Sequence, residues 1–384
     1  MTCRIVHVIT RLVRGGAARV AVDLSVAARG WYGACEVMHG AEEPPDPALA
    51  RELAAAGVAT RVVLELVRDP SPVRDLAALS ALTRSFRENP PDLVHAHTSK
   101  AGVLAVLAAS RAGVRAIVFA PHGNVFPEAG GVPGVPPAGL RRRAMMLGMR
   151  LAGSRAHRVI ALSEADRTRM NELRLAPADR IVVISNGLRL PPLDAVISPV
   201  TPRSGGAVIG VIARMTAEKG HSVLLRAAAQ LRGVFPGLTV RLVGGGPLKA
   251  SLRAEAAGLG IGNAVEFLGF RDVLPPLLAK MDVVAVPSTY EGFGLTIVEA
   301  MGMARPVVAS RVGGIPEVVA EGETGLLVPP GDHGALAEAM AEILKDPAQA
   351  RAMGEAGRRR AERLFSLEIM LERYRNLYDE LLEG

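Results

Sequence analysis

Two glutamates flank a glycine loop near the C-terminal end of the sequence. Glu291 and Glu299 stand in the segment VPSTYEGFGLTIVEAMG, where Gly292 and Gly294 separate a short apolar run from a helical pattern. Glycines let a ligand approach the backbone, and the free N–H groups of a helix N-terminus favour an anion such as a phosphate. Carboxylates beside such amides pair well with sugar hydroxyls. The segment is therefore a candidate sugar-nucleotide site, and the alternative is two solvated carboxylates at an ordinary turn.

Cations and glycines follow other predicted strands. Arg214 and Lys219 lie between an apolar run and a helical pattern, where both could reach a leaving diphosphate or simply be solvated. Gly15 and Gly16 follow the first predicted strand and could present backbone amides to a diphosphate. They lack the spacing of a dinucleotide or P-loop motif, so a plain tight turn is the alternative.

Three histidines lie on or just after predicted strands. His95 and His97 alternate along one strand, so their imidazoles share a face of the sheet. Zinc binding is one interpretation, but no third ligand of suitable spacing follows, so packed or hydrogen-bonded imidazoles are favoured and no metal is expected. His122 ends the next strand beside Gly123, a better position for contact with a ligand.

Composition and charge narrow the class of protein. The 384 residues are 49% hydrophobic with two cysteines, Cys3 and Cys35, which indicates a large enzyme in a reducing compartment. Residues 1–190 hold 25 Lys and Arg against 16 Asp and Glu, whereas the remainder holds 20 against 22. Few aromatic residues accompany the arginines, so nucleic acid is excluded as a partner. Anionic membrane or a pyrophosphate-bearing acceptor suits the basic half better. The N-terminal apolar run is too short for a signal peptide or a membrane span, which predicts a cytoplasmic protein.

Strand and helix patterns alternate along the chain, which predicts an α/β fold with parallel sheets. Strands are expected at 4–9, 36–39, 61–64, 93–97, 116–119, 159–162 and 181–184, then at 208–212, 239–243, 265–268, 283–286, 306–309 and 326–328. A proline-rich stretch interrupts the pattern. We therefore predict a Rossmann-like domain at 1–190, a linker at 191–205, a second Rossmann-like domain at 206–365, and a C-terminal helix at 366–384 that packs back toward the first domain.

These motifs together resemble the retaining glycosyltransferases of family 4. The matching segments are EGFGLTIVE, GVIARMTAEKG, GGGP, GFR and HAHTSKAG followed by PHGN, the last two being similar to enzymes of capsular polysaccharide and lipid-linked glycan synthesis. The resemblance implies a GT-B fold, in which two Rossmann-like domains face a central cleft. It assigns catalytic roles to His122, Arg214, Lys219 and Glu291, and donor binding to Gly15, Gly16, Gly244, Gly245, Arg271, Gly292, Phe293, Gly294, Leu295, Thr296 and Glu299. The family glycine pair is often followed by Ala-Glu, and Ala18 stands here instead of that glutamate.

The resemblance further implies transfer of a hexose-type sugar from a UDP- or GDP-sugar to an acceptor hydroxyl, with retention of the anomeric configuration. The acceptor is a glycan, a lipid-linked sugar or a small molecule such as a natural product. No Asp-x-Asp motif is present, so neither metal nor other cofactor is expected, because fixed cations can stabilise the leaving diphosphate. Two rival interpretations remain open: an epimerase or phosphorylase on the same fold, and a non-catalytic sugar-nucleotide-binding subunit.

An arginine-rich segment follows a Gly/Pro-rich loop in the basic half. Arg141, Arg142 and Arg143 begin a helical pattern whose apolar positions are Met145, Met146, Met149 and Leu151. If these apolar residues form one face, the helix could rest on anionic lipid at the inner face of the cell membrane and meet a lipid-linked acceptor there. The alternative is a surface helix that packs on the sheet with its arginines in water.

Overall fold

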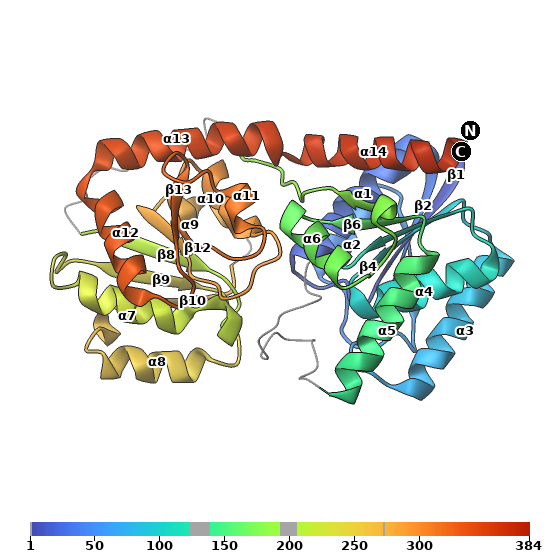
Figure 1. Cartoon of the computed structure of the whole chain (residues 1–384), viewed down its shortest axis with the longest axis horizontal. Helices are drawn as coiled ribbons and strands as arrows, with labels where there is room; N and C mark the ends of the chain where they lie inside the picture. Colours follow the sequence, from blue (N-terminus) through green and yellow to red (C-terminus); the bar gives the residue numbers. More distant parts are fainter. Residues whose placement is uncertain (1, 123–138, 193–205, 272) are drawn as a thin grey trace. The chain divides into compact units, whose positions relative to one another are not determined.

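The computed structural model describes residues 2–122, 139–192, 206–271 and 273–384. They form two compact units (Figure 1). The N-terminal unit contains residues 2–122, 139–186 and 370–384, and the C-terminal unit contains the described residues from 187 to 369. The predicted Gly/Pro-rich loop at 123–138 and residues 193–205 of the predicted linker lie outside the described residues.

The N-terminal unit is built on a seven-stranded parallel sheet in the order β3-β2-β1-β4-β5-β6-β7. Its strands are β1 (Cys3–Ile9), β2 (Gly33–Gly40), β3 (Ala59–Val63), β4 (Leu93–His97), β5 (Ala116–Ala120), β6 (Arg158–Ala161) and β7 (Ile181–Val183). Residues of β1 and β4 are almost all buried, as expected of inner strands that helices cover on both faces. Consecutive side chains on these strands therefore point to opposite faces of the sheet, and both faces are buried.

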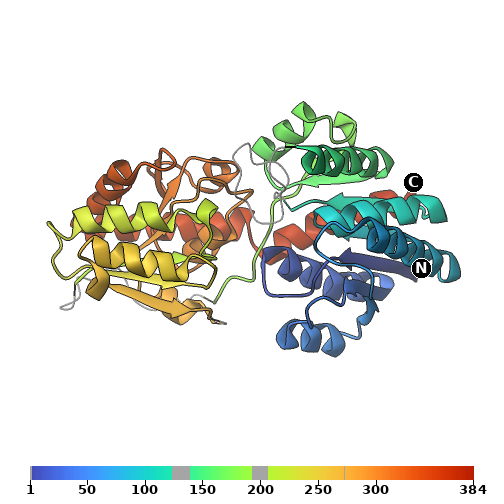
Figure 2. The ribbon, with the colours of Figure 1, turned by 90° about the horizontal axis from the view of Figure 1, so that it is seen from below.

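Helices cover both faces of this sheet. They are α1 (Gly16–Tyr32), α2 (Pro47–Ala55), α3 (Pro72–Glu88), α4 (Ser99–Ala112), α5 (Leu140–Arg155) and α6 (Glu164–Glu172), with α14 (Leu367–Glu383) returning at the end of the chain. One face holds the core that joins Val94 and Ala96 to α3, α4 and α5. The opposite face carries His95, which meets Tyr374 and Tyr378 of α14. Figure 2 shows the helices α3 and α4 in front of this unit and α14 behind it.

The C-terminal unit contains a six-stranded parallel sheet in the order β10-β9-β8-β11-β12-β13. Its strands are β8 (Val208–Ile212), β9 (Thr239–Val243), β10 (Val265–Gly269), β11 (Val283–Val286), β12 (Val307–Ser310) and β13 (Gly325–Val328). Its helices are α7 (His221–Leu231), α8 (Lys249–Gly258), α9 (Pro275–Leu278), α10 (Leu295–Gly302), α11 (Ile315–Val318), α12 (His333–Lys345) and α13 (Pro347–Leu364). The helices α7 and α12 pack on the strands through a core of Val, Leu, Ile, Ala and Met side chains.

The predicted α/β class and every predicted strand are confirmed, with ends that move by a few residues. In each sheet the order reverses beside the first strand, between β1 and β4 and between β8 and β11. Ligands of doubly wound sheets bind beyond the carboxyl ends of the strands at such a switch point. The loops after β1, β4, β8 and β11 are therefore the positions where each unit is expected to bind.

Candidate functional site

Two loops meet at the switch point of the C-terminal unit. The loop after β8 contains the 3-10 turn Ala217–Lys219, and the loop after β11 runs from Pro287 to Gly294. The Thr289 N–H donates to the carbonyl of Glu218 over 2.8 Å. Gly220 has a φ of 65°, and a Cβ there would lie 1.9 Å from the carbonyl oxygen of Pro287. Only glycine fits such a close approach, so this residue fixes how the two loops pack.

This packing brings Lys219 and Glu291 together. Lys219 Nζ donates to Glu291 Oε2 over 2.6 Å, and about a fifth of each side chain is exposed (20% and 19%). The loop after β12 supports the pair, because Gly313 has a φ of 52° and a Cβ on it would lie 1.9 Å from the carbonyl oxygen of Glu291. Two residues that sequence reasoning placed in separate loops thus form one charged pair that a polar ligand can reach.

The helix α10 begins at Leu295, four residues after Glu291. Gly294 caps it in the left-handed conformation, with a φ of 91°, and no side chain caps the first turn. The first amides of a helix have no carbonyl partner in the preceding turn, so those of Leu295 and Thr296 suit an anion. Thr296 Oγ1 donates to the carbonyl of Ile212 over 3.1 Å, which ties the start of α10 to the end of β8.

Glu299 lies one turn further along α10. Its side chain is partly buried, and desolvation raises the pKa of its carboxyl to about 7. Within the described ranges, its carboxyl group has neither a hydrogen-bond nor an ion-pair partner. A partly desolvated carboxylate without a protein partner gains from hydroxyl donors, so Glu299 is suited to receive the diol of a ribose.

The glycine loop after β9 packs against the loop after β8, which carries Arg214. The Met215 N–H donates to the carbonyl of Gly245 over 2.8 Å, and a Cβ on Gly244 would lie 2.0 Å from the carbonyl oxygen of Ala213. A Cβ on Gly245 would meet nothing within 4 Å, so this glycine faces open space. The side chain of Arg214 is 59% exposed. An exposed guanidinium beside an open glycine loop has room to meet a phosphate.

Sequence reasoning missed Glu218 in the same loop. Its side chain is buried, its Oε1 accepts from Thr216 Oγ1 over 2.7 Å, and Arg214 Nη2 lies 4.0 Å from it. A glutamate between two expected cations carried no separate signal in the sequence. Its position holds the loop that carries Arg214 and Lys219.

Two predicted donor-binding residues lie differently from the rest. Phe293 is buried, and its ring meets Phe365 edge to face at a centroid distance of 5.4 Å. Its side chain therefore belongs to the core of the unit, which leaves only its backbone for a ligand. Arg271 is exposed and follows Gly269, which has a φ of 68° and accepts the N–H of Gly244 over 2.8 Å.

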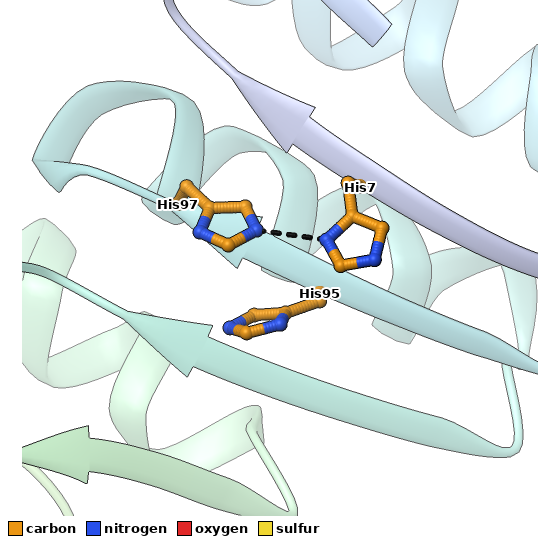
Figure 3. A group of neighbouring side chains, drawn as sticks. All are labelled: His7, His95 and His97. Carbon is orange, nitrogen blue, oxygen red and sulfur yellow. Dashed lines mark hydrogen bonds between the residues drawn. The ribbon is translucent and has the colours of Figure 1, made fainter. Parts of the chain in front are cut away.

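In the N-terminal unit, His122 belongs to a chain of imidazoles. His97 Nδ1 lies 2.9 Å from His122 Nε2, and His97 Nε2 lies 2.9 Å from His7 Nδ1. Figure 3 shows His7 on β1 facing His97 and His95 on the adjacent strand. The expected absence of a third ligand concerned only residues that follow His95 and His97, and the structure adds a third imidazole that precedes them. The third comes from an earlier strand, because parallel pairing places His7 directly beside His95.

These histidines are held neutral. Burial lowers the pKa of His7 to about 3 and that of His122 to about 4, and it lowers the pKa values of His95 and His97 well below 6.5. His95 Nδ1 makes its own hydrogen bond, with Tyr378 Oη of α14, over 2.5 Å. His7 is a polar residue within the apolar strand β1. That was the sequence signal that could have placed it beside His95 and His97.

The glycine pair after β1 opens the helix α1. Gly15 is its N-cap, and a Cβ there would meet nothing within 4 Å. The loops after β1 and β4 are joined by a hydrogen bond, since Thr10 Oγ1 and Thr98 Oγ1 lie 3.1 Å apart. Thr98 and His122 both have left-handed backbones, with φ of 64° and 60°. Strained residues of this kind persist where the surroundings determine them, and they gather at functional sites.

The arginine-rich helix α5 corrects part of the membrane expectation. Met145, Met146 and Met149 pack on the core of the unit, and Met149 is fully buried. Leu151 does not share that face, since it is 44% exposed, and Leu147 is also exposed, at 68%. Packing against α4 decided which apolar residues turn inward, and the methionines therefore cannot form a lipid-facing surface. Among the helices of the described chain, none combines the length and apolarity that a membrane span requires.

Both sheets, with their loops at the switch points, define an α/β protein of the GT-B class, and comparison with known proteins agrees. Residues 5–187 match the family described as glycosyl transferase 4-like domain, and residues 197–360 match glycosyl transferases group 1. The two matches together cover most of the chain, which belongs to the family 4 type of glycosyltransferases, as the resemblance implied.

Individual proteins extend this comparison. The D-inositol 3-phosphate glycosyltransferase of Corynebacterium urealyticum is 40% identical over 45% of this chain and 43% of its own length. The GDP-mannose-dependent alpha-(1-6)-phosphatidylinositol monomannoside mannosyltransferase of Mycolicibacterium smegmatis is 38% identical over 39% of this chain and 42% of its own length. The matches thus span less than half of these relatives. The crystal structure of Anabaena HepE with UDP-glucose has a TM-score of 0.80 at 25% identity, over 98% of this chain and 100% of that one.

Proposed function

We propose that this protein transfers a hexose-type sugar from a nucleotide-sugar to an acceptor hydroxyl. The observation that carries the proposal is the Lys219–Glu291 pair, 2.6 Å apart at the start of α10. In this proposal Lys219 and Arg214 neutralise the diphosphate while Glu291 and the amides from Gly292 to Thr296 meet the sugar and phosphates. A donor that binds there replaces part of the ion pair with charge-assisted hydrogen bonds of its own.

The nucleoside end of the donor extends along α10 and the neighbouring loops. Glu299 receives the ribose hydroxyls, and the backbone at Gly244 and Gly245, with Arg271, borders the base. Because the Glu299 carboxyl is already desolvated, a ribose costs it little further solvation. UDP-glucose and GDP-mannose are the first donors to test, since UDP-glucose is bound in the HepE crystal structure and the name of the mannosyltransferase specifies GDP-mannose.

The reaction retains the anomeric configuration in this proposal. The bond between the anomeric carbon and the diphosphate oxygen breaks, and the acceptor oxygen bonds to the same face of that carbon. The acceptor proton passes to the departing phosphate oxygen, and the nucleoside diphosphate leaves. Fixed cations stabilise the charge that grows on the leaving group, so no metal ion is required. His122 contacts the donor sugar on the reacting face.

Two classes of acceptor follow from the relatives. One has a soluble polyol phosphate in its name and the other a phosphatidylinositol glycoside. The lipid-linked acceptor is favoured by the basic N-terminal half and by α5, where the exposed Leu147 and Leu151 accompany the exposed Arg141 and Arg143. We therefore propose peripheral association with an anionic membrane, through Arg141, Arg142 and Arg143.

A donor screen tests the proposal. Calorimetry with UDP, GDP and dTDP identifies the base, and turnover of the matching sugar donors is then followed with inositol phosphate or with phosphatidylinositol-containing vesicles. Nuclear magnetic resonance of the product gives its anomeric configuration. An epimerase would change the donor without any acceptor, and a phosphorylase would need phosphate. Binding without turnover on any acceptor would favour the non-catalytic subunit, and absence of nucleotide binding would refute the proposal.

A further inference from the structure

The imidazole chain in the N-terminal unit reaches from the sheet core to the residue that the proposed function places at the donor sugar. His97 lies in the middle and uses both ring nitrogens, one toward His7 and one toward His122, each over 2.9 Å. His7 and His97 are fully buried, and His122 is 9% exposed. Among the described residues, His122 Nδ1 and His7 Nε2 are buried and have no hydrogen-bond partner. The imidazole chain therefore has one buried, unsatisfied nitrogen at each end, which is a polar atom that gains from a ligand's hydroxyl group.

We infer that His7 and His97 are positioning residues, which fix the ring orientation and tautomer of His122 and leave its Nδ1 free for a sugar hydroxyl. This inference rests on the proposed function, in which His122 contacts the donor. It adds two residues whose side chains are buried in the sheet and which act only through His122.

The hydrogen-bond chemistry dictates how these rings must behave. A neutral imidazole carries one N–H and one acceptor nitrogen, so His97 can donate to only one of its neighbours and must accept from the other. If His97 donates through Nε2 to His7, its Nδ1 accepts from Nε2 of His122, and all three rings carry the proton on Nε2. If it donates in the other direction, all three carry it on Nδ1. The three tautomers are therefore coupled.

The backbone adds a second reason for positioning. His122 has a φ of 60°, which a residue with a Cβ rarely adopts. The Thr98 N–H donates to the carbonyl of Ala120 over 2.9 Å, so the loop after β4 holds the end of β5 that leads to His122. A strained backbone and a hydrogen-bonded ring together restrict this side chain to one orientation. Restriction of this kind lowers the cost of aligning a catalytic group with its substrate.

A buried metal ion would be a different use of His7, His95 and His97, whose ring nitrogens approach within 4.8 Å of one another. The ring planes argue against it. His7 and His97 lie edge to edge, with their planes 19° apart and His7 Nδ1 facing His97 Nε2 over 2.9 Å (Figure 3), whereas His95 stacks on His97 at 29° with a centroid distance of 4.0 Å. Nitrogen lone pairs lie in the ring plane, so the facing nitrogens of His7 and His97 point at each other and those of the stacked His95 run alongside them, whereas a tetrahedral ion needs all three lone pairs to converge on one point.

The first test measures the tautomers directly. Wild-type protein labelled with nitrogen-15 in its histidines is studied by two-bond proton–nitrogen correlation, with assignments from single substitutions. We expect His7, His97 and His122 to share one tautomer. A different tautomer at His122 from that at His97, or averaging between tautomers at either ring, would overturn the inference. A stoichiometric metal ion in the purified protein that is lost from His7→Leu would overturn it too.

The second test separates positioning from packing. In His7→Asn an amide atom occupies the place of Nδ1 and can keep the bond to His97, whereas His7→Leu removes it. We expect kcat with UDP-glucose or GDP-mannose to fall about fivefold to tenfold in His7→Leu and to stay within about twofold in His7→Asn. A purely structural role predicts the reverse order, because a buried leucine is tolerated better than a buried amide.

His39 provides the matched control. It is also a buried strand histidine, on β2, and its Nδ1 bonds to the carbonyl of Gly40 rather than to the imidazole chain. His39→Leu should leave kcat and the three tautomers unchanged. If the wild type binds and turns over no nucleotide-sugar, the proposed function is refuted. If an active wild type shows mixed tautomers, or His39→Leu lowers kcat as much as His7→Leu, the inference fails while the proposed function stands.

Discussion

Replacing Glu299 by glutamine should raise the unfolding free energy of the ligand-free protein and weaken its binding to a nucleotide. Desolvation raises the pKa of this carboxyl from 4.5 to about 7, so ionisation at neutral pH costs the folded state up to about 3 kcal/mol. Because the side chain is only partly buried, solvent screens the charge, and we expect about 1 to 2 kcal/mol. Glutamine has the shape of the protonated acid and does not titrate, so the variant escapes this cost.

The sign of the pH dependence follows from the same pKa. The unfolded chain releases the Glu299 proton near pH 4.5, whereas the folded protein keeps it up to about pH 7. The folded state binds more protons between these values, so this group makes the wild type less stable as the pH rises through that window. Glu299→Gln should therefore equal the wild type at pH 4.5 and exceed it in unfolding free energy at pH 8.

Urea unfolding can assign this difference to the right unit. Trp31 is the only tryptophan and lies in α1, so its fluorescence follows the N-terminal unit alone. Circular dichroism follows both units. The substitution should shift the circular dichroism transition at pH 8 and leave the fluorescence transition in place. Equal stability of the two proteins at pH 8 would refute the assignment of a desolvated carboxyl.

Calorimetry completes the test. Loss of charge-assisted hydrogen bonds from the ribose, about 1.5 to 3 kcal/mol, should weaken binding of the cognate nucleoside diphosphate about 10- to 100-fold. The wild type should bind more tightly as pH rises from 6 to 8, because protonation competes with the ribose, and the variant should lose this dependence. Glu338→Gln, at an exposed position of α12, is the control. Unchanged affinity in Glu299→Gln would remove Glu299 from the site.

Four further predictions follow from the structure. Arg214→Ala and Lys219→Ala should each lower kcat about tenfold or more with little change in KM, since charge on the diphosphate grows as the glycosidic bond breaks, and a rise in KM alone would contradict the assignment. Gly313→Ala should cost about 1 to 3 kcal/mol and reduce turnover, because its Cβ would lie 1.9 Å from the carbonyl oxygen of Glu291; Gly322→Ala, also at positive φ but facing open space, should cost only the backbone strain, about 1 kcal/mol. Turnover should persist in EDTA, and loss that Mg²⁺ or Mn²⁺ restores would show that a metal is needed. Wild type should sediment with anionic liposomes at low salt, whereas the variant with Arg141, Arg142 and Arg143 changed to Gln should not, and equal sedimentation would indicate another surface or a soluble acceptor.

Local pattern was sufficient to predict the sheets. A short apolar run of valines and alanine such as Val283 to Val286 is typical of a strand in a sheet that is covered on both faces, and glycine or proline residues follow many of these runs. The position of Glu291 in a loop and of Glu299 on the following helix came from the same reasoning, because periodicity changes from strand to helix between them. The family matches then extended these local features to residues 5–187 and 197–360.

Pairing between distant segments could not be predicted in the same way. His7 and His97 are far apart in sequence, and only the parallel register of β1 with β4 makes them neighbours. The inward turn of Met149 and the outward turn of Leu147 depend on how α5 packs on α4, since both residues suit either environment. The sequence by itself determined the elements and the residue types at their ends, through local sterics and periodicity. Tertiary structure alone decided which of these residues meet, because long-range packing sets burial, and burial sets the pKa of Glu299 and the neutrality of the imidazole chain.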